Sequence, residues 1–173
     1  NDLRSFFISN KKPINVFADK NTSKYLKNNF SYCFDTYSRE YPATLKLNKI
    51  SNKLFIKDKK KNVSIKPITV QHGNVSSICY VIDKKLAYIS DVSKIFDKDY
   101  KYFKNLKYLI IDCLWYRNHP SHFNLEKSLE IIKKFSPQKA ILTNLHTDID
   151  YNQIRKILPK NIVPAYDGLS VNL

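Results

Sequence analysis

The chain has 173 residues, of which 43% are apolar and 26% charged, so it can bury a core and is not a disordered polymer. Lys and Arg outnumber Asp and Glu by 30 to 15, and this excess fits either a phosphate-rich partner or a solvated lysine surface caused by A+T-rich codons. No apolar run approaches the roughly 20 residues that span a bilayer. We therefore predict a single domain over residues 1–173 with no transmembrane helix.

The first half of the chain predicts one strand and one helix, followed by a run of strands. Residues 13–18 form a β-branched segment typical of a strand, and the cap-like pair Asn21-Thr22 begins a helix that runs to Asn29. A hairpin loop is predicted at the lysine-rich run 57–61. Three strand-like segments predict a meander: residues 44–47, 54–56 and 63–70.

The second half predicts a hairpin and then alternating strands and helices. Asp83-Lys84-Lys85 reads as the turn of the hairpin, and Asn124 is placed to cap a helix. Asp167-Gly168 is most simply a turn. This order favours a sheet covered by helices, an α/β fold, over an all-β sandwich. The predicted strands are 78–82, 86–89, 108–111 and 140–143, and the predicted helices are 125–135 and a further one that residues 154–158 close.

Three imidazoles and one carboxylate stand just past the ends of predicted strands: His72, Asp91, His122 and His146. In layered α/β folds the loops at one edge of the sheet form the binding crevice, so these four side chains are expected at one edge. Imidazole and carboxylate groups suit zinc, manganese or iron. The spacing therefore predicts a metal site, against the simpler alternative of unrelated surface residues.

The cysteines suggest the cellular compartment, and the first residue bears on where the natural chain starts. Cys33, Cys79 and Cys113 are odd in number and lie in apolar segments, which suits reduced, buried thiols in the cytoplasm better than disulfides. Cys113 has no nearby histidine base in the sequence and is expected in the core. The chain begins at Asn1 without a methionine or a signal-peptide pattern, so we expect the natural start to lie upstream.

Six short strings together resemble the metallo-β-lactamase-fold hydrolases, in the branch near the phosphoribosyl cyclic phosphate phosphodiesterases. They occur in the family's order with similar spacings, and the resemblance covers nearly all of the chain. It implies an α/β fold of the αββα sandwich type, incomplete at the N-terminus. The strings are ITVQHG (68–73), YISD (88–91), LIID (109–112), HPSHFNL (119–125), ILTNLHTD (141–148) and PAYDG (164–168).

The resemblance assigns roles to the strand-end residues. It implies that His72 binds one metal, that Asp91 bridges two and that His146 binds the second. His122 matches a histidine that contacts the substrate phosphate or the leaving group. The family's main motif, His-x-His-x-Asp-His, is absent from these residues and is expected directly before Asn1. The resemblance therefore implies that the chain is the C-terminal portion of a two-metal hydrolase.

The chain departs from the family at the last ligand. Relatives often have Thr-His-Leu-Ser-His there, which puts Asn144 at the position of the ligating histidine. Because two residues along extended backbone keep the same face, His146 can substitute. Asn144 could instead be a weak oxygen ligand or could donate a hydrogen bond to a ligand.

For other polar residues near these strings, both a role at the metal site and a purely structural role are considered. Asp112 could orient a ligand histidine or cap the loop that follows it. His119 is expected at the surface, and Asp148 and Asp150 are expected to cap a helix in preference to binding metal.

The predicted function is metal-dependent phosphodiester hydrolysis, in which two divalent ions, zinc or manganese, activate a hydroxide. The 173 residues alone are expected to be inactive because three protein groups cannot hold two metals firmly. Two alternatives remain: an RNA-end-processing nuclease of the same fold, and a basic nucleic-acid-binding module without catalysis. The expected partner is a small phosphodiester, with nucleic acid and a homodimer left open and no membrane partner.

Overall fold

The computed structural model describes residues 3–57 and 62–173, and the chain divides into two compact units between Ser51 and Asn52. Unit 1 ends at Ser51, and unit 2 runs from Asn52 to Leu173. The chain thus divides at a position where the sequence shows no boundary.

Unit 1 is built from three helices and two parallel strands. The helix α2 is capped by Asp19, one position before it begins, and not by the Asn21-Thr22 pair, because the Asp19 carboxylate accepts hydrogen bonds from both of their backbone N–H groups. Among the described residues of unit 1, only Ala18 is buried. The elements are α1 (Leu3–Asn10), β1 (Ile14–Ala18), α2 (Lys20–Asn29), α3 (Ser31–Phe34) and β2 (Leu45–Lys49).

The predicted meander is wrong in its first strand. β2 pairs with β1 in parallel, and the two form a sheet of their own in which Ile14 faces Leu45 and Ala18 faces Lys49. Parallel strands need a crossover, which α2 and α3 supply between them. The next strand along the chain, β3, belongs to unit 2.

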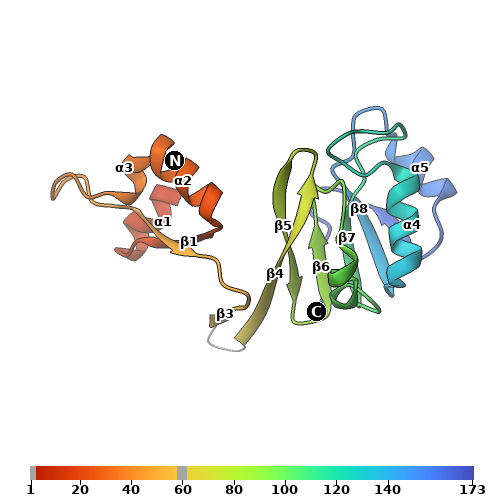
Figure 1. The fold of residues 1–173 in the computed structure, drawn as a ribbon, viewed down its shortest axis with the longest axis horizontal. Helices are drawn as coiled ribbons and strands as arrows, with labels where there is room; N and C mark the ends of the chain where they lie inside the picture. Colours follow the sequence, from red (N-terminus) through yellow and green to blue (C-terminus); the bar gives the residue numbers. More distant parts are fainter. Residues whose placement is uncertain (1–2, 58–61) are drawn as a thin grey trace. The chain divides into compact units, whose positions relative to one another are not determined.

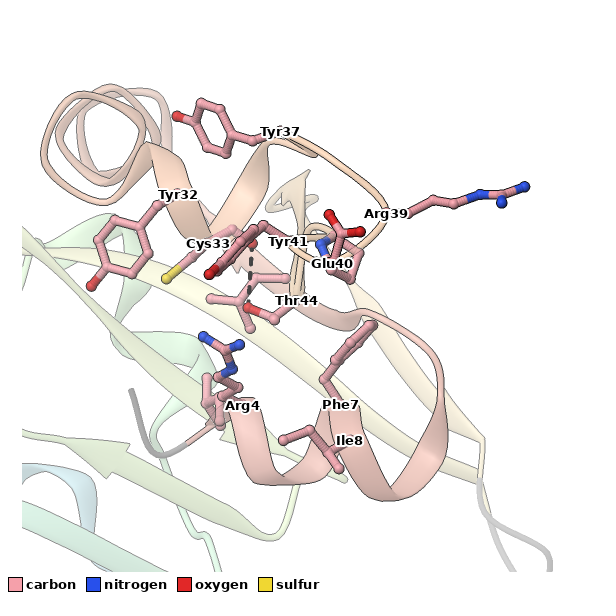
Figure 2. A pocket seen from close by; sticks show the side chains of 13 residues that line it. Arg4, Phe7, Ile8, Tyr32, Cys33, Tyr37, Arg39, Glu40, Tyr41 and Thr44 are labelled. Atoms are coloured by element: carbon pink, nitrogen blue, oxygen red, sulfur yellow. Dashed lines mark hydrogen bonds between the residues drawn. The ribbon is translucent and has the colours of Figure 1, made fainter.

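A pocket of about 400 Å³ opens within unit 1. Figure 2 shows Arg4 and Phe7 of α1 on one side of it and Tyr32, Cys33 and Tyr41 on the other. In the part of unit 1 that the structure describes, its lining contains no histidine, and the Cys33 thiol is accompanied by no second metal donor of the imidazole or thiol type. This pocket therefore does not provide the predicted metal site.

Unit 2 is a seven-stranded mixed sheet in the order β3-β4-β5-β6-β7-β8-β9 (Figure 1). Pairing is antiparallel from β3 to β6 and parallel from β6 to β9. The predicted hairpin around Asp83-Lys84-Lys85 is confirmed, since Ile82 faces Leu86 across it. The hairpin loop predicted at 57–61 lies largely outside the described residues. The strands are β3 (Leu54–Lys57), β4 (Asn62–His72), β5 (Val75–Ile82), β6 (Leu86–Ile89), β7 (Tyr108–Asp112), β8 (Lys139–Thr143) and β9 (Ile162–Pro164).

The helices of unit 2 follow β6, β7 and β8. A 3₁₀ helix, η1 (Asp97–Tyr102), comes after β6, α4 (Leu125–Phe135) after β7 and α5 (Tyr151–Ile157) after β8. Figure 1 shows α4 beside the part of the sheet that contains β7, with which it is in contact. The predicted helix 125–135 is confirmed at both ends.

The predicted caps are confirmed at Asn124 for α4 and at Asp150 for α5, but not at Asp148. Asn124 accepts a hydrogen bond from the backbone N–H of Lys127, and Asp150 accepts one from that of Gln153, so each helix start satisfies an otherwise unpaired donor. Asp148 is not a cap: its carboxylate accepts a hydrogen bond from the Trp115 indole at 3.0 Å.

The core of unit 2 lies between α4 and the sheet. Phe135 is fully buried and stacks on Phe103, with ring centroids 5.3 Å apart. Cys79 and Cys113 are also buried, and burial raises the pKa of each thiol to about 12, so both stay protonated at neutral pH. The core position predicted for Cys113 is confirmed. None of the helices in the described residues is both long enough and apolar enough to cross a membrane.

The direction of the strands fixes where a site can form. β4 and β6 are both antiparallel to β5 and therefore run the same way, and β7 and β8 run parallel to β6. The carboxyl ends of β4, β6, β7 and β8 consequently share one edge of the sheet, which we call the carboxyl edge. The strand starts lie at the opposite edge.

Candidate metal centre

Three of the predicted residues meet at the carboxyl edge: His72, Asp91 and His122. One potential ligand atom from each lies within 4.8 Å of the others, and we call this set the donor group. The rings of His72 and His122 meet edge to face, with centroids 4.7 Å apart. Both histidines are half-buried, whereas Asp91 is exposed. The donor group comes from the ends of β4 and β6 and from the loop after β7.

His72 owes its position to a tight turn. It is the last residue of β4 and faces Val75 across a hairpin of two residues, of which Gly73 has a φ of +58°. The positive φ favours glycine here, and a Cβ at Gly73 would stand 3.1 Å from the hydroxyl oxygen of Ser121, a tight contact that would oblige this side chain to shift. The approach brings the Ser121 carbonyl to 2.8 Å from His72 Nδ1.

Asp91 lies in a loop that is fastened to the end of β4. Its φ is +51°, a left-handed conformation that Asp tolerates better than most residues. Two positions later, Ser93 donates its backbone N–H to the Gln71 carbonyl at 2.7 Å, and its hydroxyl accepts from the N–H of Gly73 at 3.0 Å. The strand that carries His72 and the loop that carries Asp91 are thus held together by direct hydrogen bonds.

Asp112 connects the remaining loops. This last residue of β7 is fully buried, and its carboxylate accepts from His122 Nδ1 at 2.8 Å, from the N–H of Val92 at 3.1 Å and from the side-chain amide of Asn144 at 3.1 Å. Its backbone carbonyl accepts from the Ser128 hydroxyl of α4. Of the two roles open for Asp112, orienting a histidine is the one the structure shows.

The donor group fits a divalent cation. A carbonyl oxygen can only accept, so His72 must donate from Nδ1 to Ser121, which leaves Nε2 with its lone pair. The Asp112 carboxylate imposes the same tautomer on His122. Imidazoles whose other nitrogen donates to a carbonyl or carboxylate are typical of protein metal sites. Together with the Asp91 carboxylate, these two nitrogens place three donor atoms around one point, and each of them could hold a metal or face a substrate bound to it.

His146 lies outside the donor group, unlike the sequence-based expectation. β8 ends at Thr143, and Asn144 then takes a φ of +60°, so the extended backbone assumed between Asn144 and His146 is interrupted. The imidazole of His146 instead stacks on Trp115, with centroids 4.9 Å apart, and its Nδ1 lies 3.6 Å from a carboxylate oxygen of Asp148. Of the two residues, Asn144 is the one that reaches the site, as a hydrogen-bond donor to Asp112.

His119 is exposed, as predicted, although its ring lies 5.2 Å from that of His122. Its Nδ1 accepts from the backbone N–H of Ser121 at 3.3 Å. The residues that sequence reasoning did not single out are Ser93 and Ser121. They act through backbone atoms or a hydroxyl, and no residue-type pattern marks such contacts in advance.

Replacing Asp112 tests the hydrogen bonds that join these loops. Asp112→Asn keeps the shape but puts an N–H₂ group opposite at least one donor, so we expect about 1–3 kcal/mol less stability and a metal affinity roughly 10- to 100-fold lower. Urea unfolding and zinc titration measure the two effects. The matched control is Asp148→Asn, since this carboxylate is about half exposed and accepts from Trp115. Equal effects of the two changes would contradict a special role for Asp112.

The comparisons with known proteins agree with this arrangement. A model of the β-lactamase superfamily domain matches residues 1–144. The chain belongs to this family. An octanoyltransferase from Porphyromonas gingivalis is 26% identical over 157 residues, which cover 89% of this chain and 31% of that protein. The chain thus spans about a third of this curated relative.

Two solved structures show the same fold. A diphosphatase of the PhnP family has a TM-score of 0.80 at 24% identity, with 94% of this chain and 59% of that one covered. Zn²⁺-bound PqqB from Methylobacterium extorquens has a TM-score of 0.69 at 11% identity, covering 99% and 68%. The predicted α/β fold of metallo-β-lactamase type is confirmed. Hydrolases that bind divalent metals are typical of this fold family. In this chain, the donor group is the candidate position for such a metal ion.

Proposed function

We propose that this chain forms part of a metal-dependent hydrolase that cleaves phosphodiesters, with His72 and Asp91 as metal ligands and His122 facing the substrate. The convergence of these three side chains at the carboxyl edge is the observation that carries the proposal. The likeness of fold to a PhnP-family diphosphatase supports a phosphorus-containing substrate. A small phosphodiester is the proposed partner, and the three free cysteines support a cytoplasmic setting.

Zinc or manganese at the donor group would supply Lewis acidity toward a phosphoryl oxygen and a water of lowered pKa. The chain itself supplies positioning. Asp112 holds the His122 ring with Nδ1 toward the carboxylate, so Nε2 is the atom left to meet a substrate oxygen. A protonated Nε2 could stabilise charge on the phosphate or give a proton to the leaving oxygen.

Two ions need more ligands than the donor group offers. His72 and Asp91 can serve one ion, and Asp91 has a second oxygen for another. His146 stays a predicted ligand of the second ion, and this role would require its ring to leave Trp115. We therefore propose that the 173-residue chain alone binds a metal but does not turn over substrate.

Titration of the 173-residue chain with Zn²⁺ or Mn²⁺ tests the ligand assignment. We expect His72→Ala to weaken binding more than the roughly 10- to 100-fold that loss of a supporting hydrogen bond costs. His119→Ala is the matched control, because this exposed imidazole lies near His122 without belonging to the donor group, and it should leave the affinity unchanged. Equal losses in the two variants would overturn the assignment.

Hydrolysis of bis(p-nitrophenyl) phosphate tests the reaction. The natural protein should release nitrophenol, and a chelator should abolish the release. The 173-residue chain should show no hydrolysis above the chelated control. Chelator-sensitive turnover by this chain would contradict the proposal that it needs further ligands, and chelator-insensitive turnover by the natural protein would contradict metal dependence.

A further inference from the structure

Unit 2 carries a pocket of about 510 Å³ whose lining is dominated by lysine. Lysines make up 26 of the 173 residues of the chain but five of the nine that line this pocket. Among the described residues, no carboxylate and no arginine contributes to the lining. The concentration is well above what a uniformly lysine-rich surface would give. The cationic residues are Lys53, Lys66, Lys84, Lys101 and Lys104, and they surround Tyr102.

Two of the positive charges in this lysine pocket lie over the same ring, and four of its five lysines form no ion pair in the described part of the chain. Lys66 Nζ lies 4.3 Å and Lys101 Nζ 5.2 Å from the centroid of the same Tyr102 ring. Within the described part of the chain, Lys66, Lys84, Lys101 and Lys104 form no ion pair. The nearby carboxylate of Asp83 accepts hydrogen bonds from the backbone and hydroxyl of Ser64. A bound anion would therefore relieve mutual repulsion among the ammonium groups.

The lysine pocket lies far from the donor group. Lys66 precedes His72 by six residues on β4, a distance of about 20 Å at the usual strand rise of roughly 3.3 Å per residue. Lys84 belongs to the turn that starts β6, whereas Asp91 follows the end of that strand. The pocket is thus at the opposite edge of the sheet. That edge is basic beyond the pocket as well, because Lys85, Lys107 and Lys139 stand at the starts of β6, β7 and β8.

We propose that the lysine pocket binds the phosphate backbone of a single-stranded nucleic acid such as RNA and anchors it away from the donor group. Lysine ammonium groups act as point charges for phosphates, whereas carboxylates are matched best by the planar fork of arginine, which the lining lacks. The pocket is much larger than one phosphate, and a flexible strand can follow a concave surface that a duplex cannot enter.

The binding is expected to be independent of base sequence. Two ammonium groups already lie over the Tyr102 ring, so this ring strengthens the charge cluster by cation–π contacts and is not free to stack on a base. Lysine–phosphate contacts carry no base information. The proposal does not depend on the hydrolase function, because binding at this edge needs neither metal nor turnover.

Fluorescence anisotropy with a labelled 12-nucleotide oligouridine, in the presence of a chelator and at several salt concentrations, tests the proposal. The test variant is Lys84→Gln/Lys101→Gln/Lys104→Gln, all three of which are exposed. Each phosphate contact contributes about 0.7 to the slope of log affinity against log salt for single strands, so the slope should fall by about 2 in magnitude. We expect at least tenfold weaker binding at 0.1 M salt.

The matched control is Lys20→Gln/Lys24→Gln/Lys27→Gln, which removes the same charge from the exposed face of α2 and should keep the slope. Replacing the three pocket lysines by arginine should retain RNA binding, which separates loss of charge from loss of fold. Three outcomes would overturn the proposal: equal weakening by the two glutamine variants, competition by polyglutamate of equal charge as strong as that by RNA, or no binding of the wild-type protein.

Discussion

His122→Ala is expected to lower turnover of a phosphodiester by the natural protein roughly 10²- to 10⁴-fold, the loss that removal of a proton-transferring side chain typically causes. The ring is fixed by Asp112 and lies against His72, so its free nitrogen is next to the place where a metal-bound substrate would sit. Metal content should stay unchanged if His72 and Asp91 are the ligands. Steady-state kinetics and metal analysis of the same preparation measure both quantities.

Two further variants separate substrate contact from metal binding. His72→Ala should lose metal and activity together, whereas His119→Ala should retain both. If His122→Ala removes metal as completely as His72→Ala, His122 is itself a ligand and the proposed division of roles is wrong. If His122→Ala keeps full turnover, the residue has no part in the reaction.

Phe135→Ala is expected to destabilise unit 2 by about 3–5 kcal/mol, because it leaves a cavity among fully buried side chains. The lost ring stacks on Phe103 and meets Tyr100 edge to face, with both centroid distances 5.3 Å. Urea unfolding followed by circular dichroism measures the change. Ile157→Ala is the control, since this side chain is 68% exposed and should cost less than about 0.5 kcal/mol. A loss below 1 kcal/mol for Phe135→Ala would contradict the packing described.

Elements with strong local signals could be predicted from the sequence. The helix α4 has an Asn124 cap and apolar residues at helical spacing, and its ends are those predicted. β7 and β8 are short apolar runs between polar segments, and both were found within one residue of the expected bounds. In these segments local preference and burial in the core favour the same structure.

Elements with weak local signals were missed. The helix α1 has only eight residues and buries none of them, so the helical spacing of Leu3, Phe6 and Phe7 is a weak signal. β9 has three residues and includes Pro164, a residue that argues against a strand. β2 was predicted as a strand but with the wrong neighbour, since its pairing with β1 depends on a crossover that the local pattern does not encode.

The candidate site was predictable in position but not in detail. Strand ends place His72, Asp91 and the His122 loop at one edge, because the direction of the strands decides where those ends lie. The orientation of side chains beyond a strand depends on single backbone angles. At Asn144 a positive φ interrupts the extended backbone. The ring of His146 then stacks on Trp115, which lies in a different loop. Neither fact is visible in a one-dimensional pattern.

The hydrogen bonds around the donor group also bear on the order of events in folding. They join residues far apart in the chain: His72 and Ser121 are separated by 49 positions, Asp112 and Asn144 by 32, and Val92 and Asp112 by 20. Closing a long loop costs conformational entropy, so contacts of such long sequence separation form only after the intervening chain has been ordered. We therefore expect the donor group to assemble late, once β4 to β8 are in place. Metal would then bind after most of the fold has formed. Zinc fingers differ in this respect, because they need their ion in order to fold at all.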